Sequence, residues 1–142
     1  MSFVKKGKGL LIAASVAVVA AIVAAIVIEP PAHARKKRLD DRRVQDLSQI
    51  ESVVNEYWRR QQKLPPALTS LQGVGLKVSI VDPETALPYE YTPLSEQSYR
   101  ICANFSFETG NARNRPWPAQ TAEWSHTAGR HCFERTVRQK LG

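Results

Sequence analysis

Residues Leu39 to Leu64 read LDDRRVQDLSQIESVVNEYWRRQQKL, and this stretch decides the fold because it predicts one long amphipathic helix. Its apolar residues recur at steps of three and four, which places them on a single helix face. These residues are Val44, Leu47, Ile50, Val54, Tyr57 and Trp58. The prolines at 65 and 66 end the helix, since proline has no backbone N–H to donate. An apolar face of this length predicts a second layer of structure that covers it.

Short segments after the helix predict that second layer. Residues 76–80, 89–91, 99–107 and 124–137 combine apolar alternation with flanking turn residues, which is typical of β-strands. Side chains alternate between the two faces of a strand. In the strongest segment, 99–107, Cys102 therefore points away from the face shared by Tyr99, Ile101, Ala103, Phe105 and Phe107. We expect an α+β fold, with the long helix packed on a small antiparallel sheet of three to four strands.

An uncharged run precedes the helix. Gly9 to Ile28 contains 20 residues, and a helix of that length spans about 30 Å, the thickness of a bilayer core. The run predicts an uncleaved transmembrane helix, a signal-anchor. A cleaved secretory signal is the alternative, because Ala32-His33-Ala34 has the small-x-small form of a cleavage site. The predicted organisation is a basic N-terminal flank (1–8), the transmembrane helix (9–28), a proline break with a basic juxtamembrane linker (29–38), and the globular head (39–142).

The positive charge of the chain is concentrated beside the apolar run. The formal net charge is +7, yet residues 44–142 contain 11 Lys and Arg against 10 Asp and Glu. The basic residues that flank the predicted span are Lys5, Lys6, Lys8, Arg35, Lys36, Lys37 and Arg38. This placement suits anionic lipid headgroups. It disfavours a nucleic-acid partner, which would need a basic patch on the folded head.

Two signals disagree about the side of the membrane on which the head lies. More basic residues follow the run than precede it, which favours a cytoplasmic head. Cys102 and Cys132 are the only cysteines, and a cysteine pair in a small domain predicts a disulfide in an exported compartment. We give the cysteines more weight and expect an exported head.

Three groups of residues along the head carry a resemblance to a known family. They are Asp46-Leu47, Ile50, Val54 and Tyr57 on the helix, then Leu64-Pro65 and Leu68, then Asp82-Pro83 followed by Pro88-Tyr89-Glu90-Tyr91. Together, over residues 39–92, they resemble the pilins and pseudopilins of type IV pili and type II secretion. The resemblance implies a pilin-like head that acts through protein contacts in a secretion or pilus-like assembly. It also suggests that a disulfide between Cys102 and Cys132 is the counterpart of the C-terminal disulfide loop of type IV pilins.

The chain departs from that family at its prepilin peptidase motif. In the family, a glutamate follows the processed glycine by five residues and lets a subunit dock into a filament. Residues 8–13 read KGLLIA, and no glutamate stands at that spacing. The resemblance is therefore to the head of a pilin-like protein and does not extend to its processing signal.

Metal and nucleophile chemistry have weak support in the sequence. Cys102, His126, His131 and Cys132 are residue types that bind zinc, but their spacing matches no zinc motif, and the disulfide is the better prediction. Ser125 and His126 are neighbours without the turn that activates a serine nucleophile. Asp82 and Glu84 supply too few oxygens to specify calcium, so we expect an ordinary turn there.

Trp117 and Trp124 bracket a proline-rich loop and form a candidate interaction surface, because tryptophan is enriched at binding hot spots. The alternative is that they fold back over a small core.

The sequence as a whole predicts a non-enzymatic, single-pass protein of the bacterial inner membrane with its head in the periplasm. The expected partners are the membrane and unidentified proteins, with no cofactor, no metal, no nucleic acid and no small-molecule substrate. The alternative is a minor single-span subunit of a membrane enzyme or transporter complex. Small residues on the span, Ala14, Ala20 and Ala24, would allow close packing on a partner helix.

Overall fold

The structure is a computed structural model that describes residues 3–27, 30–74, 77–110 and 123–138. The chain divides into two compact units, residues 1–35 and 36–142. The elements in chain order are helix α1 (Phe3–Val27), helix α2 (Pro31–Gln61), the 3₁₀ helix η1 (Leu68–Val74), and strands β1 (Glu90–Pro93), β2 (Ser98–Phe105) and β3 (Gly129–Thr136).

Helix α1 contains most of the uncharged run and presents apolar side chains to its surroundings. Those with more than half of their surface exposed are Ile12, Val16, Val18, Val19, Ile22 and Val23. Within the described ranges, no helix has both the length and the apolar character needed to cross a membrane. The predicted span ends at Ile28, which lies outside the described residues, and the span stays a prediction.

Helix α2 begins earlier than the sequence predicts. It starts at Pro31, so residues 31–38 of the segment expected to be a linker (29–38) are helical. Proline is well tolerated in the first turn of a helix, where its missing N–H has no intrahelical partner to lose. The carbonyl of Pro30 accepts from the N–H of Ala34 at 3.2 Å. The helix ends at Gln61, and Gln62 follows with φ of 53°, a left-handed conformation common directly after a helix.

The apolar face predicted for α2 is confirmed. Leu47, Ile50 and Val54 are completely buried, and Trp58 is nearly so. Val44 and Tyr57 are partly buried against the same core. Each such side chain contributes roughly 1.5–3 kcal/mol when it is fully buried, so this stripe is a main source of stability for the head.

The sheet has three antiparallel strands in the order β1-β2-β3. The prediction of a strand at 76–80 is wrong for the described part of that segment, since 77–80 has no strand structure. Val78 and Ile80 still pack on the core, so their alternation reflects burial without strand pairing. A single antiparallel bridge pairs Val81 with Pro88 directly after this segment.

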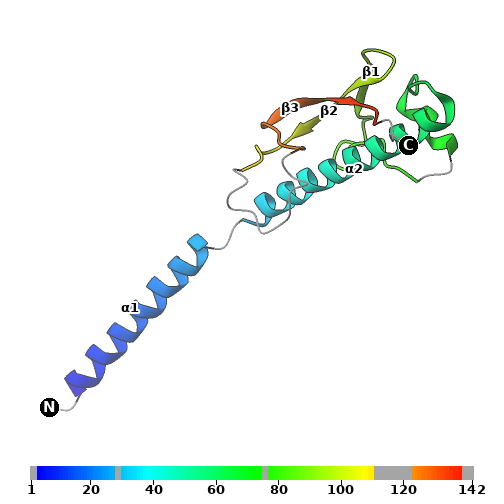
Figure 1. Ribbon diagram of the computed structural model, residues 1–142. Coiled ribbons are helices and arrows are strands. Elements are labelled where there is room, and N and C mark those ends of the chain that lie inside the picture. The colour runs from blue at the N-terminus through cyan, green and yellow to red at the C-terminus, as the bar shows by residue number, and fades with distance from the viewer. Residues whose placement is uncertain (1–2, 28–29, 75–76, 111–122, 139–142) are drawn as a thin grey trace. The chain divides into compact units, whose positions relative to one another are not determined.

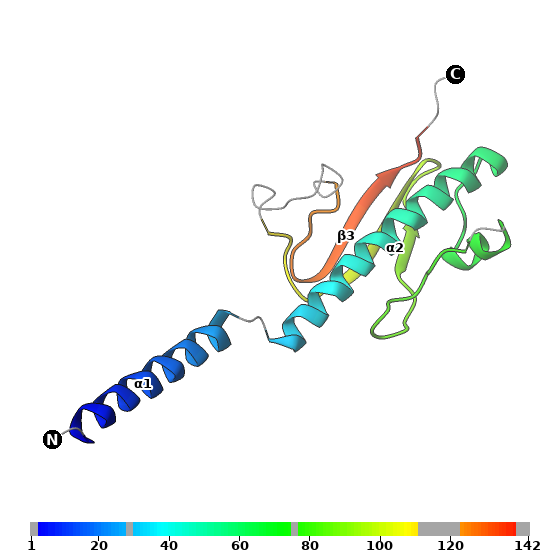
Figure 2. The ribbon, with the colours of Figure 1, turned by 90° about the horizontal axis from the view of Figure 1, so that it is seen from below.

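Helix α2 lies along one face of the sheet (Figures 1 and 2). Strand β2 supplies Tyr99, Ile101, Ala103 and Phe105 to the core between them. Cys102 lies on the opposite face, as the alternation predicts, because it pairs directly with Cys132 of β3. The predicted α+β class, with a long helix and an antiparallel sheet, is therefore confirmed for the head.

Candidate functional site

A buried arginine, Arg43, forms the centre of a charged cluster in the N-terminal half of α2. Its side chain is 3% exposed, and its guanidinium contacts three carboxylates. Nη1 donates to Asp40 Oδ1 at 2.8 Å, and Nε donates to Asp82 Oδ2 at 2.5 Å. Nη2 donates to Asp82 Oδ1 at 3.1 Å and to Glu84 Oε2 at 2.7 Å. We call these four residues the Arg43 cluster; only arginine offers the planar fork that such pairing requires.

Asp40 extends the Arg43 cluster to the chain that leaves β2. Its Oδ1 accepts from the backbone N–H of Ser106, and its Oδ2 accepts from the backbone N–H of Phe107, both at 2.9 Å. Buried backbone N–H groups need such partners, because leaving one unpaired costs about as much as a lost hydrogen bond. Asp40 therefore stabilises this exit from the sheet as well as the charge of Arg43.

Asp82 closes its own turn while it binds Arg43. Its Oδ1 accepts from the backbone N–H groups of Glu84 at 2.9 Å and Thr85 at 3.0 Å. Burial alone would raise the pKa of the Asp82 carboxyl. The hydrogen bonds from Arg43 and from the two backbone N–H groups outweigh burial, and the pKa is lowered to about 2. Asp82 is therefore a stable carboxylate at neutral pH.

The charged groups of the Arg43 cluster form hydrogen bonds with one another. The hydrogen bond that Arg43 donates to Asp82 raises the pKa of Arg43 more than burial lowers it, so the guanidinium stays protonated. Asp82 and Glu84, the pair considered for calcium, both direct oxygens at Arg43. Among the described residues, no group of three or more His, Cys, Asp or Glu is arranged to hold a metal. The cluster fits a structural clamp better than a centre for binding or proton transfer.

A second buried polar contact lies one turn further along α2. The hydroxyl of Tyr89 donates to Asp46 Oδ2 at 3.0 Å, and Arg42 Nε lies 3.3 Å from Asp46 Oδ1. Burial raises the pKa of Tyr89, and the charge of Asp46 raises it further. This contact joins two of the three groups of residues that carry the resemblance, the D-L pair on the helix and the P-Y-x-Y segment.

The buried charges of α2 are not predicted by the apolar periodicity alone, although the sequence contains a signal for them. Asp40, Arg43, Leu47, Ile50 and Val54 follow one another at steps of three and four. The two charged residues therefore continue the apolar stripe toward the N-terminus of the helix. Oppositely charged residues in line with the apolar face of a helix indicate a buried ion pair. Charged residues on the opposite face indicate side chains exposed to solvent.

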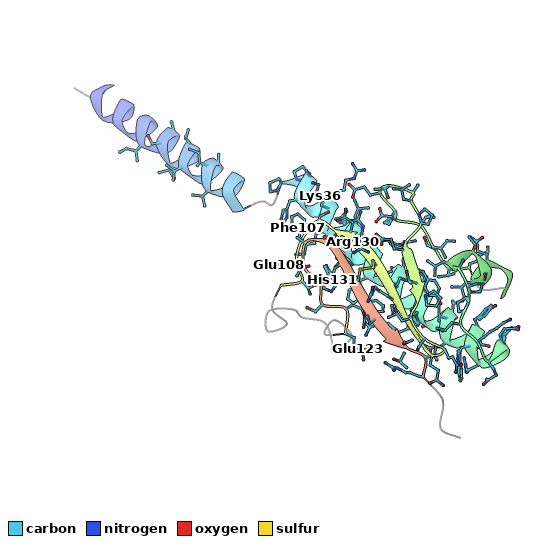
Figure 3. The ribbon with its side chains drawn as sticks, turned by 90° about the horizontal axis from the view of Figure 1, so that it is seen from above. Lys36, Phe107, Glu108, Glu123, Arg130 and His131 are labelled. Atoms are coloured by element: carbon cyan, nitrogen blue, oxygen red, sulfur yellow. A yellow bond between two sulfur atoms is a disulfide. The ribbon has the colours of Figure 1, made fainter. Side chains whose placement is uncertain are left out.

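The predicted disulfide between Cys102 and Cys132 is present, with an S–S distance of 2.13 Å. It lies on the sheet face opposite α2, between two ion pairs. Arg130 pairs with Glu90 across the full width of the sheet, and Arg100 pairs with Glu134. Figure 3 views the sheet with α2 behind it and labels Arg130 at the start of β3.

The structure does not join the histidines to a metal-binding or nucleophilic arrangement. His126 Nδ1 lies 2.8 Å from Thr109 Oγ1 and 3.0 Å from the carbonyl oxygen of Trp124, and its ring stacks on Phe105. His131 contacts Thr127 through its Nδ1 atom. The cysteines considered with them are bonded to each other. These side chains hold the segment before β3 against the sheet.

Trp124 is not part of an exposed surface, which corrects one of the two tryptophan predictions. It is buried, its ring packs edge-on against Phe133, and the guanidinium of Arg135 lies over it at 4.2 Å. Burying this apolar ring at the end of a small core is more favourable in free energy than exposing it to water. Trp117 lies outside the described residues.

The basic residues of the flank differ from the arginines of the head. Arg35, Lys36, Lys37 and Arg38 are exposed, and no carboxylate in the described part of the chain pairs with them. Every described arginine from 42 to 138 has an acidic partner within the chain. The side chains of Lys5, Lys6 and Lys8 lie outside the described residues.

Comparisons with protein-family models, with curated proteins and with solved structures find no match to this chain.

Replacing Arg43 with methionine tests the clamp. Arg43→Met keeps an unbranched side chain but leaves three carboxylates together without their cation, so we expect the free energy of unfolding to fall by about 3–5 kcal/mol. Urea unfolding followed by circular dichroism measures it. Arg60→Met, which removes an exposed pair with Glu56, is the control and should leave the unfolding midpoint unchanged. Equal effects of the two substitutions would contradict the clamp.

The lowered pKa of Asp82 predicts the pH dependence of stability. The folded state keeps this carboxylate charged down to about pH 2, whereas the unfolded chain binds the proton near 3.8. The contribution, about 2 kcal/mol, is complete above pH 4 and is lost as the pH falls from 4 to 2. Unfolding free energies measured from pH 5 to pH 2 should fall more steeply for the wild type than for Arg43→Met. Parallel curves would show that Arg43 does not set this pKa.

Proposed function

We propose that this chain is a membrane-anchored, non-enzymatic protein whose pilin-like head acts through protein–protein contacts in a secretion or pilus-like assembly. The observation that carries the anchor is the group of exposed, unpaired cations beside the apolar run. The described arginines of the head pair with acidic residues, while the exposed cations at residues 35–38 have no acidic partner in the described chain. They follow the apolar run closely in the sequence, where anionic lipid headgroups would neutralise them.

The apolar surface of α1 supports the same proposal. The valines and isoleucines between Ile12 and Val23 are more than half exposed, and water is a poor environment for such an apolar surface. A bilayer core would remove this surface from water, provided that the run from Gly9 to Ile28 is inserted as a whole. The described helix on its own does not meet the criteria for a span, so the anchor rests on the full run in the sequence.

The pilin-like character of the head rests on how its parts are joined. A long helix packs on a three-stranded antiparallel sheet, and the Asp82 turn is bound to that helix by Arg43. The P-Y-x-Y segment is bound to it by Tyr89 and Asp46. The disulfide between Cys102 and Cys132 supports an oxidising compartment, which in a bacterium is the periplasm.

Contact with other proteins is favoured over catalysis because the ionisable groups are used internally. Arg43 holds the three carboxylates around it by hydrogen bonds, and His126 is enclosed by hydrogen bonds and by the ring of Phe105. General acid–base chemistry requires a group that exchanges its proton with a substrate near neutral pH. Asp82, whose pKa is about 2, is unsuited to that task.

The alternative role, a minor subunit of a membrane enzyme or transporter complex, is favoured by one feature of α1. A shallow groove along this helix is lined by Ser15, Val16, Val19, Ala20, Val23 and Ala24. Small residues on one helix face allow a partner helix to approach closely within a bilayer.

Purification of the full-length chain from membranes in mild detergent distinguishes the two roles. We expect proteins of a secretion or pilus-like assembly to copurify, and to be lost when residues of the head surface are changed while Ala20 and Ala24 are kept. A stoichiometric enzyme or transporter that is lost on Ala20→Leu, with the head unchanged, would support the alternative. Recovery of the chain alone after chemical cross-linking in intact cells would contradict both.

A further inference from the structure

The disulfide has two chemically different sides. The register aligns Glu90 of β1, Cys102 of β2 and Cys132 of β3 in one row across the sheet. Arg130 reaches back over this row, and its Nη2 atom lies 3.7 Å from the sulfur of Cys102. Glu90 holds the guanidinium in place, with Nε at 2.9 Å from Oε1 and Nη2 at 2.6 Å from Oε2. One sulfur therefore has a fixed cation beside it.

The two sulfurs also differ in access. Cys102 lies in the central strand and is 3% exposed, whereas Cys132 is half-buried and lies in an edge strand of the described sheet. A thiolate attacks a disulfide along the axis of the S–S bond. Attack on Cys102 would come from the side of β1, where the pair of Glu90 and Arg130 covers the sulfur. Attack on Cys132 comes from the side of β3 that faces away from β2.

We propose that Cys102–Cys132 is a thiol-exchange site in which Cys132 is the attacked sulfur and Cys102 is the leaving group. An incoming thiolate forms a bond to Cys132 Sγ, the S–S bond breaks, and its electron pair goes to Cys102 Sγ. The guanidinium of Arg130 stabilises the thiolate that is released. A second thiol of the reductant then attacks the mixed disulfide, which leaves both cysteines reduced and the reductant oxidised to its disulfide.

The rest of the head supports the sheet after reduction. Eight residue pairs join β2 to β3, and the side chains of these strands that pack on α2 lie on the face opposite the sulfurs. The two cysteines therefore remain opposite each other in the reduced protein and can form the bond again. The proposed ligand class is a small thiol or a dithiol protein of the exported compartment, and the exchange leaves the fold intact.

Reaction of the full-length chain in detergent micelles with reduced glutathione tests the proposal. Acid quenching and alkylation with N-ethylmaleimide, followed by peptide mass spectrometry, identify which cysteine carries each group. We expect glutathione on Cys132 and N-ethylmaleimide on Cys102. Arg130→Gln should slow the first step by roughly threefold to tenfold, because the leaving thiol loses its stabilising cation.

Arg100→Gln is the matched control. Arg100 also pairs with a glutamate on this sheet face, but no contact of the described chain joins it to either sulfur. Its rate should equal that of the wild type. Glu90→Gln is the second variant, and it should increase the share of glutathione found on Cys102. Glutathione on Cys102 in the wild type, or equal rates for Arg130→Gln and Arg100→Gln, would overturn the proposal.

Discussion

The buried cation of Arg43 is the constraint on which the head depends. Removing a guanidinium and the carboxylates of Asp40 and Asp82 from water costs several kcal/mol per ion, and only close pairing with good geometry offsets that cost. The pairing found here joins three segments that are far apart in the sequence: α2, the turn at residues 82–85 and the chain after β2. A helix shifted by one residue would turn Arg43 away from these carboxylates, whereas the apolar stripe alone would tolerate a small slide. The Arg43 cluster therefore sets where α2 lies along the sheet.

The remaining elements follow from that placement. With the Asp82 turn held on α2, Tyr89 comes within 3.0 Å of Asp46, and β1 begins at the next residue. Strand β2 then pairs with β1, and β3 with β2, so that their apolar faces cover Leu47, Ile50 and Val54. The opposite face is left to charged pairs and to the disulfide. Packing defines one face of the sheet, and electrostatics and sulfur chemistry define the other.

Local periodicity predicted the apolar face of α2, the orientation of Cys102 and the α+β class, because each depends on residues close together in the sequence. It failed where the partner is distant. The local sequence does not identify the carboxylates of residues 82 and 84 as the partners of Arg43. The alternation of apolar and polar residues around Val78 and Ile80 predicted a strand, but it reflects burial of these two side chains in the core. Pro31 was interpreted as a helix break, although its position in a first turn lets α2 begin there. Two positions stayed open for Trp124, on an exposed surface or over the core, because its partners, Phe133 and Arg135, are known only from the fold.

The central claim is that an uncleaved N-terminal run anchors a head that lies outside the cytoplasm. The intact mass of the chain, measured from spheroplasts before and after external protease, tests it most directly. We expect a full-length chain in the membrane fraction before protease treatment. After treatment, we expect a fragment that has lost residues of the head. A soluble mature chain that begins at Arg35, or a head that external protease does not reach, would contradict the claim.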